Sequence, residues 1–417
     1  MGTPTSLLLR GAALATALVA GSGVLASAAG AVPAPVHDAA SAARAAAGPD
    51  RGRPDRPEGP ARPSDPTSAE QVRVLGEQVI PKGLSFAGAP VGELSGIDYD
   101  QRGNQWYLLS DDSEEGPARY YTARFYVTQS GVTPVQFTSA QDILRSDGST
   151  FPPLATNDPE VADPEAIRLD PSDRTLYWSS EGKREVPADG SAPALVDPWV
   201  RQMTTTGRNL REFTQPSIFT MSAAEQGPRR NAVFEGLTLT TDGKEIVTSM
   251  EGSLYQDGPL PTPTSPAVNR LTWYDKASGQ PVRQVAYPLD PIPVAPIPPT
   301  AAADNGISEI LAVDKDHYLV LERSFATGVG NSIRLYEIDL RGANNILRDP
   351  SLADGAYRPV TKRLVADFAD LGLSHIDNVE GMSWGPQLRA GERSLVFVSD
   401  DNLSSSQVTQ VIALGLR

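Results

Sequence analysis

Short apolar runs separated by turn residues recur along the chain from about residue 72 onward. In one clear case, residues 235–240 and 245–250 are two strand-like runs joined by Thr-Asp-Gly at 241–243. Turns of this composition connect antiparallel neighbours. Comparable blocks, about 70 residues apart, begin at Ser95, Glu165, Glu235, Glu309 and Glu380. The pattern predicts an all-β protein built from repeated hairpins.

Two further strand-like runs follow most blocks, which gives four strands per repeat. The last repeat is one strand short, and the run VRVLGEQVI at 72–80 has no partner near it in sequence. We expect this run to be the missing outer strand that closes a ring. The prediction is a β-propeller of five four-stranded blades. Six blades is the alternative, if a long insertion such as 140–164 contains a divergent blade.

The N-terminal part of the chain differs in composition. Residues 1–31 resemble an export signal, with Arg10, a small apolar run and an A-x-A cleavage site. Residues 32–69 are rich in Pro, Ala and Arg and predict a disordered linker. The propeller domain is expected over 70–417. We therefore expect a secreted, extracellular protein, and no other segment reaches the length of a membrane span.

The composition of the chain argues against several kinds of metal site and several kinds of binding partner. There is no Cys and there are only three His, which argues against thiolate and His-rich metal sites. A net charge of −15 makes nucleic acid and anionic membranes poor partners. Cations, or small molecules that are bridged by cations, suit the charge better, although acidity can also serve solubility alone. We expect a small-molecule substrate and a monomer.

Acidic residues mark the outer ends of the predicted hairpins. In a propeller, the start of each innermost strand lies beside the end of the next strand, on one face of the ring. A single carboxylate there can simply bind backbone N–H groups. Many carboxylates that converge repel each other unless cations compensate, and calcium accepts six to eight oxygen ligands. Nine of the ten positions are acidic and form the predicted calcium set: Asp111, Glu165, Glu181, Glu235, Glu251, Glu309, Glu322, Glu380 and Asp400.

Ser95 breaks this pattern in the first block, although Glu93 stands two residues earlier and could replace it. Basic residues lie near the same predicted rim, and they could bind phosphate or pair with neighbouring Glu residues. The predicted substrate-binding residues are Arg119, Lys183, Arg270 and Arg323. His375 could act as a general acid or base, or make a structural hydrogen bond. The predicted catalytic residues are Glu235, Glu309, Glu380, Arg323 and His375.

The blocks together resemble a known family, the bacterial phytase-like domain labelled "esterase-like activity of phytase". The resemblance is carried by GELSGIDYD, DPEAIRLDP, FEGLTLTTDG, ISEILAVD and IDNVEGMSWGP with the strands that follow them, and it extends from about 85 to 414. It implies a β-propeller that hydrolyses phosphomonoesters or phosphodiesters. The better understood β-propeller phytases hold calcium with carboxylates at the channel mouth, but their specific motifs are not evident here, so phytate is not carried over as substrate.

Three functions remain open from the sequence. The first is a secreted, calcium-dependent phosphoric ester hydrolase, with the carboxylates as ligands and Arg323 on the phosphoryl oxygens. The second is a non-catalytic propeller that calcium stabilises and that binds a ligand. The third is a glycoside hydrolase, in which a pair of carboxylates performs acid–base catalysis. The fold alone does not choose between them.

Overall fold

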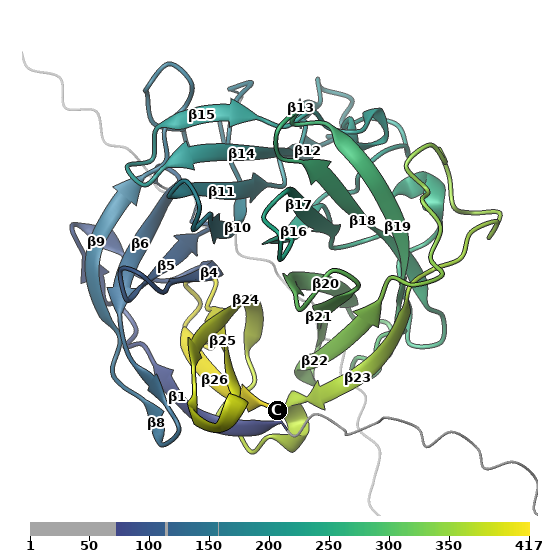
Figure 1. The fold of residues 1–417 in the computed structure, drawn as a ribbon. Helices are drawn as coiled ribbons and strands as arrows, with labels where there is room; N and C mark the ends of the chain where they lie inside the picture. The colour runs from purple at the N-terminus through teal and green to yellow at the C-terminus, as the bar shows by residue number, and fades with distance from the viewer. Residues whose placement is uncertain (1–71, 113–115, 157) are drawn as a thin grey trace, which may run out of the picture. The chain divides into compact units, whose positions relative to one another are not determined.

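The structure is a computed structural model of the chain, and it describes residues 72–112, 116–156 and 158–417. The expected export signal and linker, 1–69, lie outside these described residues. Five antiparallel four-stranded sheets are arranged around a central axis (Figure 1). The prediction of a five-bladed propeller is therefore confirmed. Between the end of β9 at Asp142 and the start of β10 at Pro164, the described residues contain only the isolated bridge between Leu144 and Thr150, so the six-blade alternative is wrong.

The blades are described from the innermost strand outward. Blade one comprises β4 (Leu94–Asp100), β5 (Gln105–Ser110), β6 (Arg119–Arg124) and β9 (Gln136–Asp142). Blade two comprises β10 (Pro164–Leu169), β11 (Thr175–Ser180), β14 (Trp199–Thr204) and β15 (Asn209–Glu212). Blade three comprises β16 (Phe234–Leu239), β17 (Glu245–Met250), β18 (Ala267–Asp275) and β19 (Pro281–Leu289).

Blade four comprises β20 (Ala303–Ala312), β21 (His317–Ala326), β22 (Gly330–Asp339) and β23 (Thr361–Asp367). Blade five comprises β24 (Asn378–Gln387), β25 (Arg393–Asp400), β26 (Gln410–Leu416) and β1 (Arg73–Val79). Short pairs are β2 (Ser85–Phe86) with β3 (Ala89–Pro90), β7 (Val127–Thr128) with β8 (Gly131–Val132), and β12 (Lys183–Glu185) with β13 (Ala194–Val196). The 3-10 turns are η1 (Ser217–Phe219), η2 (Tyr255–Asp257), η3 (Phe368–Asp370) and η4 (Arg389–Gly391).

The N-terminal strand closes the ring. β1 pairs antiparallel with β26, from Arg73 opposite Gly415 to Val79 opposite Gln410. Figure 1 shows the two ends of the described chain side by side in this blade. The pairing confirms the expectation for residues 72–80. It also protects an edge of the last blade that would otherwise present unpaired backbone groups.

Apolar side chains fill the spaces between adjacent blades. At the boundary of blades four and five, Leu319 and Leu321 lie in one buried cluster with Met382 and Phe397. Other boundaries use aromatic residues in the same way, for example Trp273 against Tyr318 between blades three and four. Inner strands are thus covered on both faces, which explains why they are almost continuously buried.

An ion pair in the channel joins the inner strands. Arg168 of β10 lies 2.6 Å from Glu309 of β20. The same guanidinium donates to the carbonyl oxygens of Ile97 on β4, at 2.7 Å, and Met382 on β24, at 2.8 Å. Glu309 also accepts a hydrogen bond from the backbone N–H of Leu237 on β16, at 2.9 Å. One pair therefore connects all five blades.

No helix in the part of the chain that the structure describes has the length and apolar character needed to cross a bilayer.

Candidate functional site

The innermost hairpin of every blade contains a register shift near its outer end. In blade one the shift falls between Leu94 and Gly96 of β4, and the other four blades have it at the corresponding place. Such a bulge redirects a side chain and often lies beside a functional site. We call the inner-strand residue that directly follows the last regular pair before this shift the bulge residue. From blade one to blade five, the bulge residues are Ser95, Glu165, Glu235, Ser308 and Glu380.

Blade four differs from the sequence-based alignment by one residue. Its bulge position is Ser308, because Ile307 pairs with Glu322 and Glu309 pairs with Leu321. Arg323 directly follows Glu322, the partner of Ile307. In blade one, Asp111 directly follows Ser110, the partner of Leu94, so Arg323 is the blade-four equivalent of Asp111. A one-residue shift turns a strand side chain to the opposite face. The structure therefore brings Arg323 to the mouth, and it does not bring Glu309 or Glu322 there.

Glu309 and Glu322 have cationic partners elsewhere. Glu309 lies in the channel against Arg168. Glu322 is 2.5 Å from the ammonium group of Lys362 and accepts a hydrogen bond from the hydroxyl of Tyr287. Both carboxylates are almost completely buried. Their positions are those of structural ion pairs.

A cavity of about 580 Å³ opens where the bulges meet. Its volume is in the range of small-molecule sites. Its lining is almost entirely polar. The lining residues are Asp111, Asp163, Glu165, Asn231, Glu235, Asp304, Arg323, Phe325, Asn331, Asn378, Glu380, Asp400, Asn402, Ser406 and Gln407.

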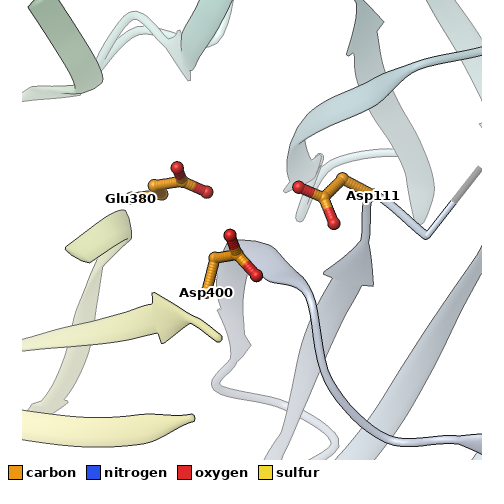
Figure 2. Close-up of side chains that lie close together, drawn as sticks. All are labelled: Asp111, Glu380 and Asp400. Carbon is orange, nitrogen blue, oxygen red and sulfur yellow. The ribbon is translucent and has the colours of Figure 1, made fainter. Parts of the chain in front are cut away.

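Carboxylates gather around this cavity in three groups. In each group, one oxygen from every member lies within 4.8 Å of the oxygens of the others. Figure 2 shows one group, in which the side chains of Asp111, Glu380 and Asp400 face a common space. We call the residues of all three groups the mouth carboxylates: Asp111, Asp163, Glu165, Glu181, Glu235, Glu251, Glu380 and Asp400.

Neighbouring amides orient several of these groups. The side-chain amide of Asn378 donates to Glu380 Oε1 at 2.8 Å and to Asp400 Oδ2 at 3.0 Å. The backbone N–H of Val233 donates to Glu181 Oε1 at 2.7 Å. Within the described residues, Glu380 Oε2 and Asp111 Oδ1 are buried without a hydrogen-bond partner. These two oxygens border the cavity, where a ligand would satisfy them.

Burial and repulsion by neighbouring acids raise the pKa values of seven of the mouth carboxylates. Burial is the largest cause, and neighbouring acids add to it. The pKa of Glu380 rises to about 8, that of Glu251 to about 7 and that of Asp400 to about 6. The pKa values of four others also lie well above the ordinary range: Asp111, Glu165, Glu181 and Glu235.

A divalent cation would relieve this repulsion. The donor set contains only oxygen atoms, mostly carboxylates, which is the set that calcium prefers. The unsatisfied oxygen of Glu380 is independent support, because this residue is only 7% exposed and faces the cavity. The residues present therefore fit calcium.

Arg323 is the only cationic side chain among the described residues that line the cavity. Its Nη2 donates to Glu251 Oε1 at 2.8 Å and lies 3.7 Å from Glu380 Oε1. Its Nη1 lies 3.7 Å from Asp304 Oδ1. The surrounding acids raise the pKa of Arg323 further, against the effect of burial. Its Nε is buried without a partner within the described residues, so part of the guanidinium is free to bind an anion.

The other predicted substrate-binding residues do not line this cavity. Arg119 pairs with Asp112 at 2.5 Å, and Arg270 pairs through two nitrogens with Asp257 at 2.6 and 2.8 Å. Lys183 donates to the carbonyl oxygen of Leu154 at 2.6 Å. It lines a smaller adjacent pocket of about 170 Å³.

Neither His of the described residues lies in the cavity lining. His375 is exposed, and one ring nitrogen lies 3.1 Å from the hydroxyl of Ser374. His317 lies at a turn of blade four, 2.9 Å from Asp314.

Sequence reasoning missed Asp163 and Asn378. Both lie two residues before a bulge carboxylate, Glu165 and Glu380, and both line the cavity. Glu93 stands at the same spacing before Ser95, and burial with nearby acids raises its pKa to about 7. A polar residue two positions before the bulge, as at Glu93, is the signal that would have found Asp163 and Asn378.

Comparison with solved structures gives propellers of low similarity. A periplasmic gluconolactonase of Pseudomonas aeruginosa has 12% identity and a TM-score of 0.31 over 77% of this chain and 85% of its own. A GH43 β-1,3-galactosidase has 9% identity and a TM-score of 0.42, covering 80% and 93%. An α-L-arabinofuranosidase from Lactobacillus brevis has 10% identity and a TM-score of 0.40, covering 77% and 90%. Similarity at this level carries no weight for function.

No curated protein matches the sequence. The family model described as "Esterase-like activity of phytase" matches residues 89–403, which span the mouth carboxylates of all four contributing blades. The chain therefore belongs to the Phytase-like family.

Proposed function

We propose that the protein is a secreted, calcium-dependent hydrolase of phosphoric esters. One observation carries the proposal: carboxylates from all five blades converge on one cavity together with Arg323. Two of the carboxylate oxygens are buried there without a partner in the described residues. Acidic ligands for a cation beside a guanidinium form an arrangement suited to a phosphoryl group. The family description points to the same class of reaction.

Two parts of the mouth would hold cations. One is the group Asp111, Glu380 and Asp400. The other comprises two groups that share Glu181, one with Asp163 and Glu165 and one with Glu235 and Glu251. A divalent cation supplies Lewis-acid polarisation of a phosphoryl oxygen and of water.

The chain's own residues bind and orient. Arg323 holds the phosphoryl oxygens through its guanidinium, while Glu251 fixes the direction of that side chain. Asn378 holds the carboxylates of Glu380 and Asp400 in place through one amide nitrogen. Of the predicted catalytic residues, Glu235, Glu380 and Arg323 belong to this proposal. Glu309 and His375 are left out because they lie away from the cavity.

Arg119, Lys183 and Arg270 are also left out of the proposed substrate-binding set. Arg119 and Arg270 are buried and paired with acids. The ammonium of Lys183 is held by two backbone carbonyl oxygens and lies near Glu185. Donors that are occupied in this way have little capacity left for a phosphoryl group.

The test is release of p-nitrophenol from p-nitrophenyl phosphate and bis-p-nitrophenyl phosphate, first with calcium and then with a chelator. We expect turnover that disappears with the chelator and in both Glu235→Gln and Glu380→Gln. Glu225→Gln, an exposed position outside the mouth, is the matched control and should retain activity.

Other outcomes would overturn the proposal. Calcium binding without turnover of either ester would instead support a non-catalytic propeller. If the protein hydrolyses glycosides at a rate that the chelator does not change, and one Glu→Gln variant loses this activity, the protein would be a glycoside hydrolase.

A further inference from the structure

Blade four extends further past the mouth than blades two and three. Its strands β20, β21 and β22 each contain ten residues, whereas β10, β11, β16 and β17 contain six. The extra length lies on the outer side of the register shift, where Asp304 stands on β20 and Phe325 on β21. The extension forms a wall beside the cavity.

A row of three side chains crosses this wall. Phe325 pairs with Asp304 on one neighbouring strand and with Asn331 on the other. Directly paired residues place their side chains on the same face of a sheet. Arg323 is two residues earlier on β21, so it also shares this face. All four residues line the cavity.

Phe325 is the only apolar residue among the described residues that line the cavity. It is 40% exposed, whereas most large aromatic side chains of the domain are buried. A scattered exposed apolar residue needs no explanation, but this one stands on the same face as the single cation of the pocket. A ligand bound to Arg323 would bring its remaining atoms to the phenyl ring.

The charges near Phe325 limit what those atoms can be. Asp304 lies beside it with a side chain that is 59% exposed, and it belongs to none of the three carboxylate groups that would hold cations. Arg323 alone among the described lining residues carries positive charge. An additional anionic group beside Phe325 would therefore meet this acid rather than a partner. An uncharged, flat group would instead cover apolar surface on Phe325.

We infer that the organic group of the substrate is apolar and flat, such as an aryl group, and that it packs on Phe325 while the phosphoryl group lies at Arg323. The inference rests on the proposed function, because it assigns the phosphoryl group to the mouth. A cavity of about 580 Å³ accommodates both parts. Phe325 is then a specificity-determining residue, and a charged anionic group in place of the aryl group is disfavoured.

The test measures binding without turnover, by calorimetric titration of the calcium-loaded protein with phenylphosphonate and methylphosphonate. We expect the phenyl ligand to bind roughly five- to tenfold more tightly, as burial of part of one aromatic face implies. Phe325→Ala should remove this preference and leave the affinity for methylphosphonate unchanged. Phe325→Leu should retain part of it. Leu364→Ala is the matched control, because Leu364 is a 51% exposed apolar residue on β23 and does not line the cavity.

Equal affinities in the unchanged protein, a preference that survives Phe325→Ala, or no binding of either ligand would each overturn the inference. The proposed function fails separately. A preference for the phenyl ligand without turnover of any ester would contradict the proposed hydrolase function and support the role of Phe325. Turnover of phosphate esters without a phenyl preference would do the reverse.

Discussion

Two sets of buried carboxylates in this protein have opposite surroundings. Glu309, Glu322 and Asp257 lie deep in the domain, and each contacts a cationic side chain at 2.5 to 2.6 Å. The mouth carboxylates mostly face one another, with Arg323 as the one cation that lines their cavity within the described residues. A buried charge is costly unless it is paired. Cationic side chains of the chain balance the negative charge of the first set. Among the described residues, the second set has too few such partners, and a bound cation would balance its charge.

The pKa values reflect the same contrast. Burial raises the pKa of Glu309 to about 7, although Arg168 and two backbone N–H groups oppose the rise. For Glu235, burial raises the pKa and three neighbouring Glu residues raise it further, with only Arg323 opposing them. Equal burial therefore has different consequences, and the neighbours decide whether a carboxylate is a structural anchor or a candidate ligand.

Among the substitutions, the largest effect is expected when a structural pair is broken. Arg168→Met leaves Glu309 buried without its cation and removes the bonds to Ile97 and Met382. We expect the free energy of unfolding, measured with urea, to fall by about 3–5 kcal/mol. The double variant with Glu309→Gln should recover much of this loss, because the buried charge is then absent. A loss below about 1 kcal/mol in the single variant would contradict the role of this pair.

Calcium should distinguish the two sets. Binding at the mouth stabilises the folded state, by about 2.7 kcal/mol at a calcium concentration of 100 Kd. In Glu380→Gln we expect the part of this gain that comes from the group of Asp111, Glu380 and Asp400 to disappear, while the stability without calcium is kept because a repelling carboxylate is removed. In Glu309→Gln we expect lower stability and an intact response to calcium. Unfolding with and without calcium measures both, and an equal calcium response in the two variants would contradict the comparison.

The stability of the mouth is also expected to depend on pH. When a chelator removes calcium, the carboxyl groups of Glu380, Glu251 and Asp400 in the folded protein stay protonated up to pH values of about 8, 7 and 6. The unfolded chain releases the same protons near pH 4 to 4.5. The folded state thus binds more protons, and stability falls as pH rises from about 5 to 8, by about 1.4 kcal/mol per pH unit for each extra proton.

Urea unfolding at pH 5, 6, 7 and 8 in a chelator tests this pH dependence. Excess calcium should flatten the curve, because the cation replaces the protons in balancing the carboxylates. A stability that is constant or that rises over this range without calcium would show that the mouth carboxylates are not mutually repelled.

The fold could be predicted from the sequence because each blade repeats one hairpin with local turn signals. The closing strand at 72–80 could also be predicted, because the last repeat has only three strands and the run at 72–80 has no partner near it in sequence. These inferences use only strand periodicity and counting. Periodicity does not reveal which residues of two strands lie opposite each other, and the site depends on that register.

Blade four shows the consequence. Its segment Ser308-Glu309-Ile310 carries a Glu at the start of an apolar strand, as blades two, three and five do, so the sequence pattern favours Glu309 as a mouth residue. The strand pairing instead places Ser308 at the bulge and Arg323 at the strand end. Likewise, the partners of Arg119 and Arg270 come from loops whose course the sequence does not indicate. Long-range register and loop packing are therefore what sequence reasoning lacked.

The smallest effect is expected at His375. Its ring is exposed, and its recorded side-chain contact is with the neighbouring Ser374. A general acid or base contributes about 10²- to 10⁴-fold to the rate, so its removal would be obvious in kcat. We expect His375→Ala to change kcat on p-nitrophenyl esters by less than about twofold and to leave its pH profile in place. A hundredfold loss would move His375 into the reacting site, and it would mean that the mouth closes around its substrate in a way that the cavity lining does not anticipate.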